Sequence, residues 1–278
     1  MAFSTAKLAA VFCTLALFAQ TPDFTCPMDP DVRSQRPGKC PRCGMKLEAR
    51  IPDFVEYPVR FSFSPPWIPA ARPLDISISV SDPATGKPVA KFETVHEKFM
   101  HLFIVSSDLE YFSHEHPDEN FALRTQLPRA GNYKLVADFY PSGGTPQLAE
   151  KIISTTGYTR TFEESLSTLA EDTGPKRGEN IEVSLAMEKP APGRKSLLFF
   201  RLKPADGIEP YLGAWAHMLI MSDDLIDTIH EHPAIADGGP ELQFDVFFPR
   251  ARTYRVWVQF QRLGKVNTVA FTIPVRPL

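Results

Sequence analysis

The sequence has no excess of basic charge, since 30 lysine and arginine residues face 33 aspartate and glutamate residues and leave a formal net charge of -3. A protein that binds nucleic acid needs a positive field to attract the phosphate backbone, so this class is set aside. Long apolar runs are also lacking after residue 19, and no later segment is expected to span a bilayer. Long amphipathic stretches are scarce, whereas 27 prolines and 21 phenylalanines favour short strands joined by turns.

The N-terminus carries the one longer apolar run. A positive charge at Lys7 precedes an apolar segment over residues 8–18, which is too short for a comfortable membrane span. The sequence therefore predicts a signal peptide over residues 1–19, with cleavage after Ala19; a retained N-terminal anchor is the alternative. In either case we expect the rest of the chain in an exported compartment, either periplasmic or secreted.

Cysteine is rare, with four residues in the chain, and removal of Cys13 with the signal peptide leaves Cys26, Cys40 and Cys43. An odd number of thiols cannot all form disulfides within one chain. Cys40 and Cys43 enclose Pro-Arg and are followed by glycine, which makes a tight knuckle of the kind that presents thiolates to a tetrahedral metal ion. A disulfide between Cys40 and Cys43, with Cys26 free, is the alternative.

Residues 24–47 resemble the small heavy-metal-binding domain of bacterial copper and silver efflux proteins. The shared motifs are Cys-Pro-Met at 26–28, Pro-Gly at 37–38 and Cys-Pro-x-Cys-Gly-Met at 40–45, and aspartate stands where the family has histidine. The resemblance implies a metal-binding module over residues 20–50. Its candidate ligands are Cys26, Asp29, Cys40 and Cys43, with Met28, Met45 or a water molecule as alternatives to Asp29.

Two repeats follow this module. The segment LPRAGNYKLVADF from Leu127 matches FPRARTYRVWVQF from Phe248, and Tyr133 and Tyr254 resemble the tyrosine corners of Greek-key sandwiches. Each repeat has about seven short strand patterns separated by turn signals. The sequence predicts an all-β fold with two tandem immunoglobulin-like sandwiches; a cupredoxin-like barrel is the near alternative. The expected ranges are 51–157 for the first repeat, 158–177 for a polar linker with one or two helical turns, and 178–278 for the second repeat.

Histidine is confined to two matching stretches, 96–117 and 213–233. Residues two apart on a strand share a face, and a hairpin folded about position 107 brings His101 opposite Ser113 or His114. Three imidazoles can then close on one ion in each repeat. The predicted sets are His101, His114 and His116 in the first repeat, and His217, His230 and His232 in the second.

His96 is the exception to the repeat, because Leu212 occupies the matching position. We expect His96 to supply a fourth ligand to the first set and to make that site the tighter one. Imidazole suits both copper and zinc, and the order of divalent affinities favours copper. In the alternative interpretation, the histidines only hydrogen-bond the backbone of their loops. The repeats also resemble exported bacterial domains that end in His-x-His-Pro.

The combined pattern favours an exported protein that binds heavy metal, with copper first and zinc as the alternative. It would sequester ions or pass them on, with a metal efflux or chaperone protein as a possible partner. No catalytic constellation is evident in the sequence. Two other hypotheses stay open: a metalloenzyme that uses an open position of a three-histidine site, and a structural or adhesive pair of sandwiches without metal.

Overall fold

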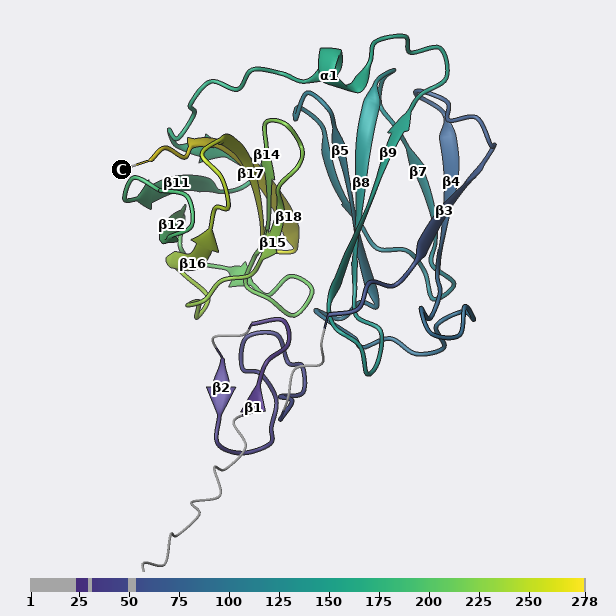
Figure 1. Cartoon of the computed structure of the whole chain (residues 1–278). Coiled ribbons are helices and arrows are strands. Elements are labelled where there is room, and N and C mark those ends of the chain that lie inside the picture. Colours follow the sequence, from purple (N-terminus) through teal and green to yellow (C-terminus); the bar gives the residue numbers. More distant parts are fainter. Residues whose placement is uncertain (1–23, 30–31, 50–53, 278) are drawn as a thin grey trace, which may run out of the picture.

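The computed structural model describes residues 24–29, 32–49 and 54–277 (Figure 1). The expected signal peptide over residues 1–19 lies outside the described residues. The fold is nearly all β, with 48% of the described residues in strands and 2% in helix. Figure 1 shows a small N-terminal module below two larger β-sandwiches that stand side by side.

The first sandwich packs a sheet of three strands on a sheet of four. Its smaller sheet has the order β3-β4-β7 and its larger sheet the order β6-β5-β8-β9. Leucine and isoleucine alternate with polar residues along Leu74–Val80, and the apolar side chains of this segment are the buried ones, as its period of two predicts. The strands are β3 (Val59–Ser64), β4 (Pro73–Val80), β5 (Met100–Ser106), β6 (Phe112–Glu115), β7 (Ala122–Gln126), β8 (Asn132–Phe139) and β9 (Gln147–Ser154).

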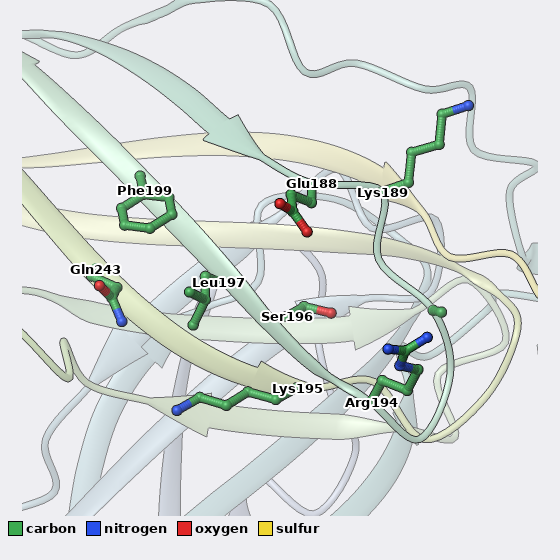
Figure 2. Close-up of a pocket in the computed structure, with 9 residues that line it drawn as sticks. Glu188, Lys189, Arg194, Lys195, Ser196, Leu197, Phe199 and Gln243 are labelled. Carbon is green, nitrogen blue, oxygen red and sulfur yellow. The ribbon is translucent and has the colours of Figure 1, made fainter. Parts of the chain in front are cut away.

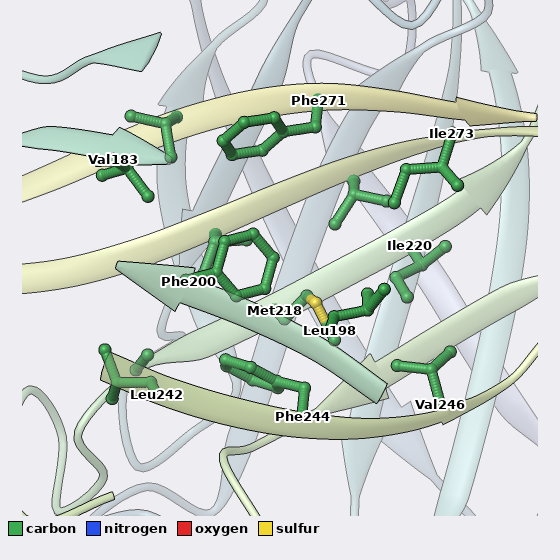
Figure 3. Packing of buried hydrophobic residues seen from close by; sticks show 14 of the residues in the cluster. Val183, Leu198, Phe200, Met218, Ile220, Leu242, Phe244, Val246, Phe271 and Ile273 are labelled. Carbon is green, nitrogen blue, oxygen red and sulfur yellow. The ribbon is translucent and has the colours of Figure 1, made fainter. Parts of the chain in front are cut away.

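The second sandwich repeats this plan with two short additions. One sheet has the order β10-β11-β12-β16, and the other has the order β13-β17-β14-β15 with β18 paired to β17. Figure 3 shows its core, in which Phe200, Phe244 and Phe271 fill the space between the sheets. The strands are β10 (Lys176–Arg177), β11 (Glu182–Met187), β12 (Lys195–Lys203), β13 (Ile208–Glu209), β14 (His217–Ser222), β15 (Thr228–Glu231), β16 (Glu241–Phe247), β17 (Thr253–Arg262) and β18 (Lys265–Pro274).

The prediction of tandem immunoglobulin-like sandwiches is confirmed, including its tyrosine corners. The hydroxyl of Tyr133 donates to the carbonyl of Arg129 at 2.8 Å, and that of Tyr254 donates to the carbonyl of Arg250 at 3.0 Å. In both repeats the tyrosine hydroxyl bonds the carbonyl four residues upstream, so equivalent hydrogen bonds close the corresponding corners of the two sandwiches.

The two sandwiches pack against each other through the sheets that carry the histidine hairpins. Every residue of β5 and of β14 is buried, because one face of each strand meets its own core and the other meets the neighbouring sandwich. An apolar cluster fills this contact. Its buried members are Phe103, Val105, Leu109 and Val136 from the first repeat and Leu219, Met221, Leu225 and Trp257 from the second.

The linker contributes to the same contact. Helix α1 (Phe162–Ser165) is one turn long and begins with a capping box in which Thr161 and Glu164 bond each other's backbone. Phe162, Leu166 and Leu169 pack on the apolar cluster between the sandwiches. The linker therefore closes one end of the contact as well as joining the repeats.

The cysteine module contains two short strands, β1 (Phe24–Thr25) and β2 (Arg33–Ser34). Its buried cysteines pack with Val95 and Tyr140 of the first sandwich, which docks the module at the other end of the contact. Over the residues that the structure describes, we find no helix with the length and apolar character needed to cross a membrane.

Candidate metal centre

The cysteine module brings three sulfurs and one carboxylate together. The Sγ atoms of Cys26 and Cys43 are 3.4 Å apart, and Oδ2 of Asp29 lies 3.3 Å from Sγ of Cys40. All three thiols are free, and the four potential ligand atoms lie within 4.8 Å of one another. Thiolates that bind one tetrahedral ion at about 2.3 Å stand roughly 3.8 Å apart, so the donor set fits a single thiophilic ion.

Asp29 is held in this set by its own contacts. Its backbone N–H donates to Sγ of Cys26 at 3.2 Å, and the guanidinium of Arg42 binds its Oδ1 at 3.1 Å, which leaves Oδ2 for the sulfurs. Hydrogen bonds from Cys26 and Cys43 hold the pKa of Cys40 well below its ordinary value, whereas burial raises the pKa of Asp29. The site is therefore ready to hold a thiolate. Among the candidates for the fourth ligand, the structure places the carboxylate of Asp29 beside the sulfurs.

The first histidine set converges as the sequence predicts. Nδ1 of His101 lies 2.9 Å from Nε2 of His114 and 3.2 Å from Nε2 of His116. Imidazoles that bind one tetrahedral ion at about 2.0 Å place their nitrogens roughly 3.3 Å apart. The spacing of these three nitrogens is thus close to that of a metal site.

The second set has a different membership. His217 and His232 come together, with 3.1 Å between Nδ1 and Nε2, but the third ring beside them is His96 of the first repeat. His96 stacks on His232 with 3.7 Å between ring centroids. The expectation that His96 completes the first set is therefore wrong. Its left-handed backbone (φ 48°) turns the ring towards the neighbouring sandwich, and Leu212 has the same conformation (φ 52°) in the second repeat.

His230 also departs from the expectation, since it is not in the set with His217 and His232. Its Nδ1–H donates to the carboxylate of Asp138 in the first repeat at 2.5 Å. The equivalent His114 donates from Nδ1 to Oε1 of Gln259 in the second repeat at 2.7 Å. In the strand registers, Asp138 lies opposite His101 and Gln259 lies opposite His217. Each of these two residues bonds a histidine of the other repeat and so orients its ring.

The hairpin register differs from the one expected about position 107. Phe103 faces His114 and Leu102 faces Glu115, so the turn is centred between residues 108 and 109. Asp108 accepts the Ser106 hydroxyl and Leu109 adopts φ 60°, which lengthens the turn. The register shifts by two residues from a His101–His114 pairing, and an even shift keeps every side chain on its face. The histidines therefore still converge.

Burial governs the charge of these rings. It lowers the pKa of His96 and of His116 to about 3 and that of His101 to about 4. The pKa values of His217 and His232 also lie well below the ordinary value for the same first reason. At neutral pH these rings are neutral, which is the form that binds metal.

The two partners that orient the histidines, Asp138 and Gln259, were not among the residues predicted from the sequence. A usable signal exists, since each is a polar residue at the matching position of the otherwise apolar strands KLVADF and RVWVQF. Metal-binding histidines commonly donate their second N–H to such a group.

Two cavities differ in their position relative to the candidate ligands. One of about 260 Å³ lies between the cysteine module and the second sandwich and is lined by Pro41, Arg42, Trp215 and His232 among others. A larger hollow of about 610 Å³ lies on the outer face of the second sandwich, where Figure 2 shows Lys195, Leu197 and Phe199. Neither histidine nor cysteine lines this outer hollow, whereas His232 lines the inner cavity.

Comparisons with known proteins support the N-terminal assignment. A family model described as a heavy metal binding domain matches residues 24–50. The N-terminal region is similar to a copper-transporting P-type ATPase of Rhizobium leguminosarum bv. viciae, with 35% identity over 75 residues. The match covers 24% of this chain and 8% of that protein, so the chain spans less than a tenth of this relative's length.

Similar solved structures include a segment of two fibronectin type III domains from chicken tenascin, with 11% identity, a TM-score of 0.25 and coverage of 79% of this chain and 100% of that one. A structure of carbohydrate-binding modules from the β-sandwich superfamily has 12% identity, a TM-score of 0.26 and coverage of 80% and 100%. A family model described as a domain of unknown function, DUF8832, matches residues 55–157 and 176–277, one match on each sandwich. The chain therefore belongs to the DUF8832 family, with a heavy metal binding domain at its N-terminal end.

Proposed function

We propose that this chain is an exported copper-binding protein that takes up the ion in its cysteine module and sequesters it or passes it to a partner. The observation that carries the proposal is the convergence of Cys26, Cys40, Cys43 and Asp29 on one point. Thiolates are soft ligands that select Cu(I) and Zn(II) among the common metals.

Copper is proposed over zinc for two reasons. The N-terminal region is similar to part of a protein named as a copper-transporting ATPase. Cu(I) is also a softer ion than Zn(II) and is therefore the better match for a set of three soft thiolates.

Export is proposed from the sequence of residues 1–19, which has the charge and apolar length of a signal peptide. An exported copper protein would sequester the ion outside the cytoplasm or hand it to an efflux or chaperone protein. The cavity between the module and the second sandwich supports a transfer role, because it leaves room beside His232 and Arg42.

Titration of the chain from residue 20 onward with Cu(I), without oxygen, tests the proposal. One equivalent should produce thiolate-to-metal absorption, and Cys40→Ser should remove it. Asp29→Ala should weaken binding, whereas Leu47→Ile, at a buried residue of the same cluster that has no ligand atom, should leave it unchanged as the matched control.

Two results would overturn the proposal. One is an absence of thiolate absorption in the fully reduced protein. The other is a chain that prefers Zn(II) to Cu(I) in competition, which would keep metal binding but remove copper.

A further inference from the structure

The histidines of both repeats meet in one buried cluster between the sandwiches. The ring centroid of His217 lies 5.8 Å from that of His101 and 5.5 Å from that of His114, across the contact between the repeats. His96 of the first repeat stacks on His232 of the second. The two sets are therefore neighbours within one interior region.

The hydrogen bonds around this cluster fix which nitrogens carry protons. Nε2 of His101 contacts the carbonyl of Val95 at 3.1 Å, and a carbonyl can only accept, so the proton is on Nε2 and Nδ1 has a free lone pair. The proton of His114 is on Nδ1, because it faces Oε1 of Gln259 while the amide of Gln259 donates to Thr268. Nε2 of His114 therefore also has a free lone pair.

These two lone pairs face each other at 2.9 Å. Two acceptors repel at this distance unless a cation lies between or beside them. A metal ion that also meets His116 satisfies all three nitrogens.

In the second set, the proton position of one of the two facing rings is fixed in the same way. Nε2 of His217 donates to the carbonyl of Tyr211 at 2.9 Å, so its Nδ1 lone pair faces His232. Nε2 of His96 and Nε2 of His230 are buried without a hydrogen-bond partner in the described structure. Unpartnered buried polar atoms are costly and need an explanation such as an ion.

We propose that the seven histidines form one centre for two divalent ions, shared by the two repeats. The first ion binds His101, His114 and His116. The second binds His217 and His232 together with His96 from the opposite repeat, while Asp138 positions His230 beside them. This inference rests on the proposed function and specifies a second class of site, in which borderline imidazole ligands take Cu(II) in place of the Cu(I) of the thiolates.

Because its ligands come from both repeats, the bound metal cross-links the two sandwiches. An ion held by His96 on one side and His217 on the other links the sandwiches directly. Metal binding should therefore stabilise the docked arrangement of the repeats as well as each site, by mass action on the docked form.

The test uses the chain from residue 20 onward with Cys26, Cys40 and Cys43 changed to serine, so that Cu(II) meets only the histidines. We expect two ions per chain, and an electron paramagnetic resonance signal of a single Cu(II) that broadens through spin coupling as the second ion binds. His96→Leu should remove the second ion and leave an uncoupled signal. The affinity for the second ion should fall by more than the roughly 10–100-fold that is typical of changes outside the ligand shell.

Leucine is a suitable replacement, because Leu212 has the same left-handed backbone at the matching position. Phe99→Leu, at a neighbouring exposed residue, is the matched control and should keep two coupled ions. Two uncoupled signals in the parent protein, or a His96→Leu variant that still binds two coupled ions, would overturn the shared centre. The outcome is separable from the proposed function, because thiolate absorption in the unmodified chain reports the cysteine module alone.

Discussion

Replacement of Trp257 by alanine should separate the docking of the sandwiches from their folding. The indole is 3% exposed and stacks on Phe112 of the other repeat, with ring centroids 5.2 Å apart and planes 13° apart. Its neighbours along β17, Val256 and Val258, point instead into the core of the second sandwich. The side chain of Trp257 therefore stabilises the contact between repeats and adds little to its own core.

The magnitude follows from the buried area. A buried aromatic side chain removes about 150–250 Å² from water, which at about 25 cal/mol per Å² is roughly 4–6 kcal/mol. Alanine retains a small part of this, so the expected cost is about 3–5 kcal/mol, in the range of other buried tryptophan deletions. Because the loss falls on the contact, most of it should appear as weaker coupling between two sandwiches that each remain folded.

Urea unfolding and limited proteolysis of the metal-free protein measure this. Trp257→Ala should split unfolding into two steps and expose the linker around Phe162 to cleavage, since the linker packs on the same cluster. Trp67→Ala is the matched control, because Trp67 is 61% exposed, and it should change neither result. Unfolding of the second sandwich alone, with the linker still protected, would refute the reasoning.

Three further predictions concern the sites and the corners. Asp29→His should tighten copper binding to the thiolates if position 29 ligates, since imidazole is the softer ligand; an unchanged dissociation constant in a chelator competition would remove it from the ligands. The metal-free protein should lose stability as the pH falls from about 6.5 to 3, because imidazoles are protonated in the unfolded chain while the buried rings of the folded protein stay neutral. For His101, with a pKa of about 4, the loss at about pH 5 is about 2 kcal/mol, and a urea midpoint equal at about pH 8 and 5 would contradict it. Tyr133→Phe should cost about 1 kcal/mol through its bond to Arg129, and a thermal midpoint equal to that of the parent would show that the corner is not stabilising.

Local patterns were sufficient to predict the fold class. The period-two alternation over Leu74–Val80, the tyrosine after a turn in each repeat and the cysteine knuckle each act over a few residues, and each is found as expected. Met100 and Met218, each next to the first histidine of its repeat, pack in the two sandwich cores.

The membership of the second histidine set could not be read in the same way. It depends on how two sheets dock, and their docking surfaces are formed by residues more than a hundred positions apart. One clue was present, because MHLFIVS and HMLIMS have apolar residues on both faces of the strand, which is typical of strands buried on both sides. The pattern indicates burial but not the partner, and His96 reaches its neighbours only through the docked sandwich.

The repeats share a framework and differ at the polar positions around the histidines. Gln259 places a neutral amide on His114, whereas Asp138 places a carboxylate on His230. Burial lowers the pKa of His96, and the negative charges of Asp138 and Cys40 oppose this shift. The carboxylate of Asp138 also opposes the lowered pKa of His101, so its negative charge acts on a histidine of each set. The sets differ instead in their surroundings, because His232 of the second set lines the cavity next to the cysteine module and no histidine of the first set does.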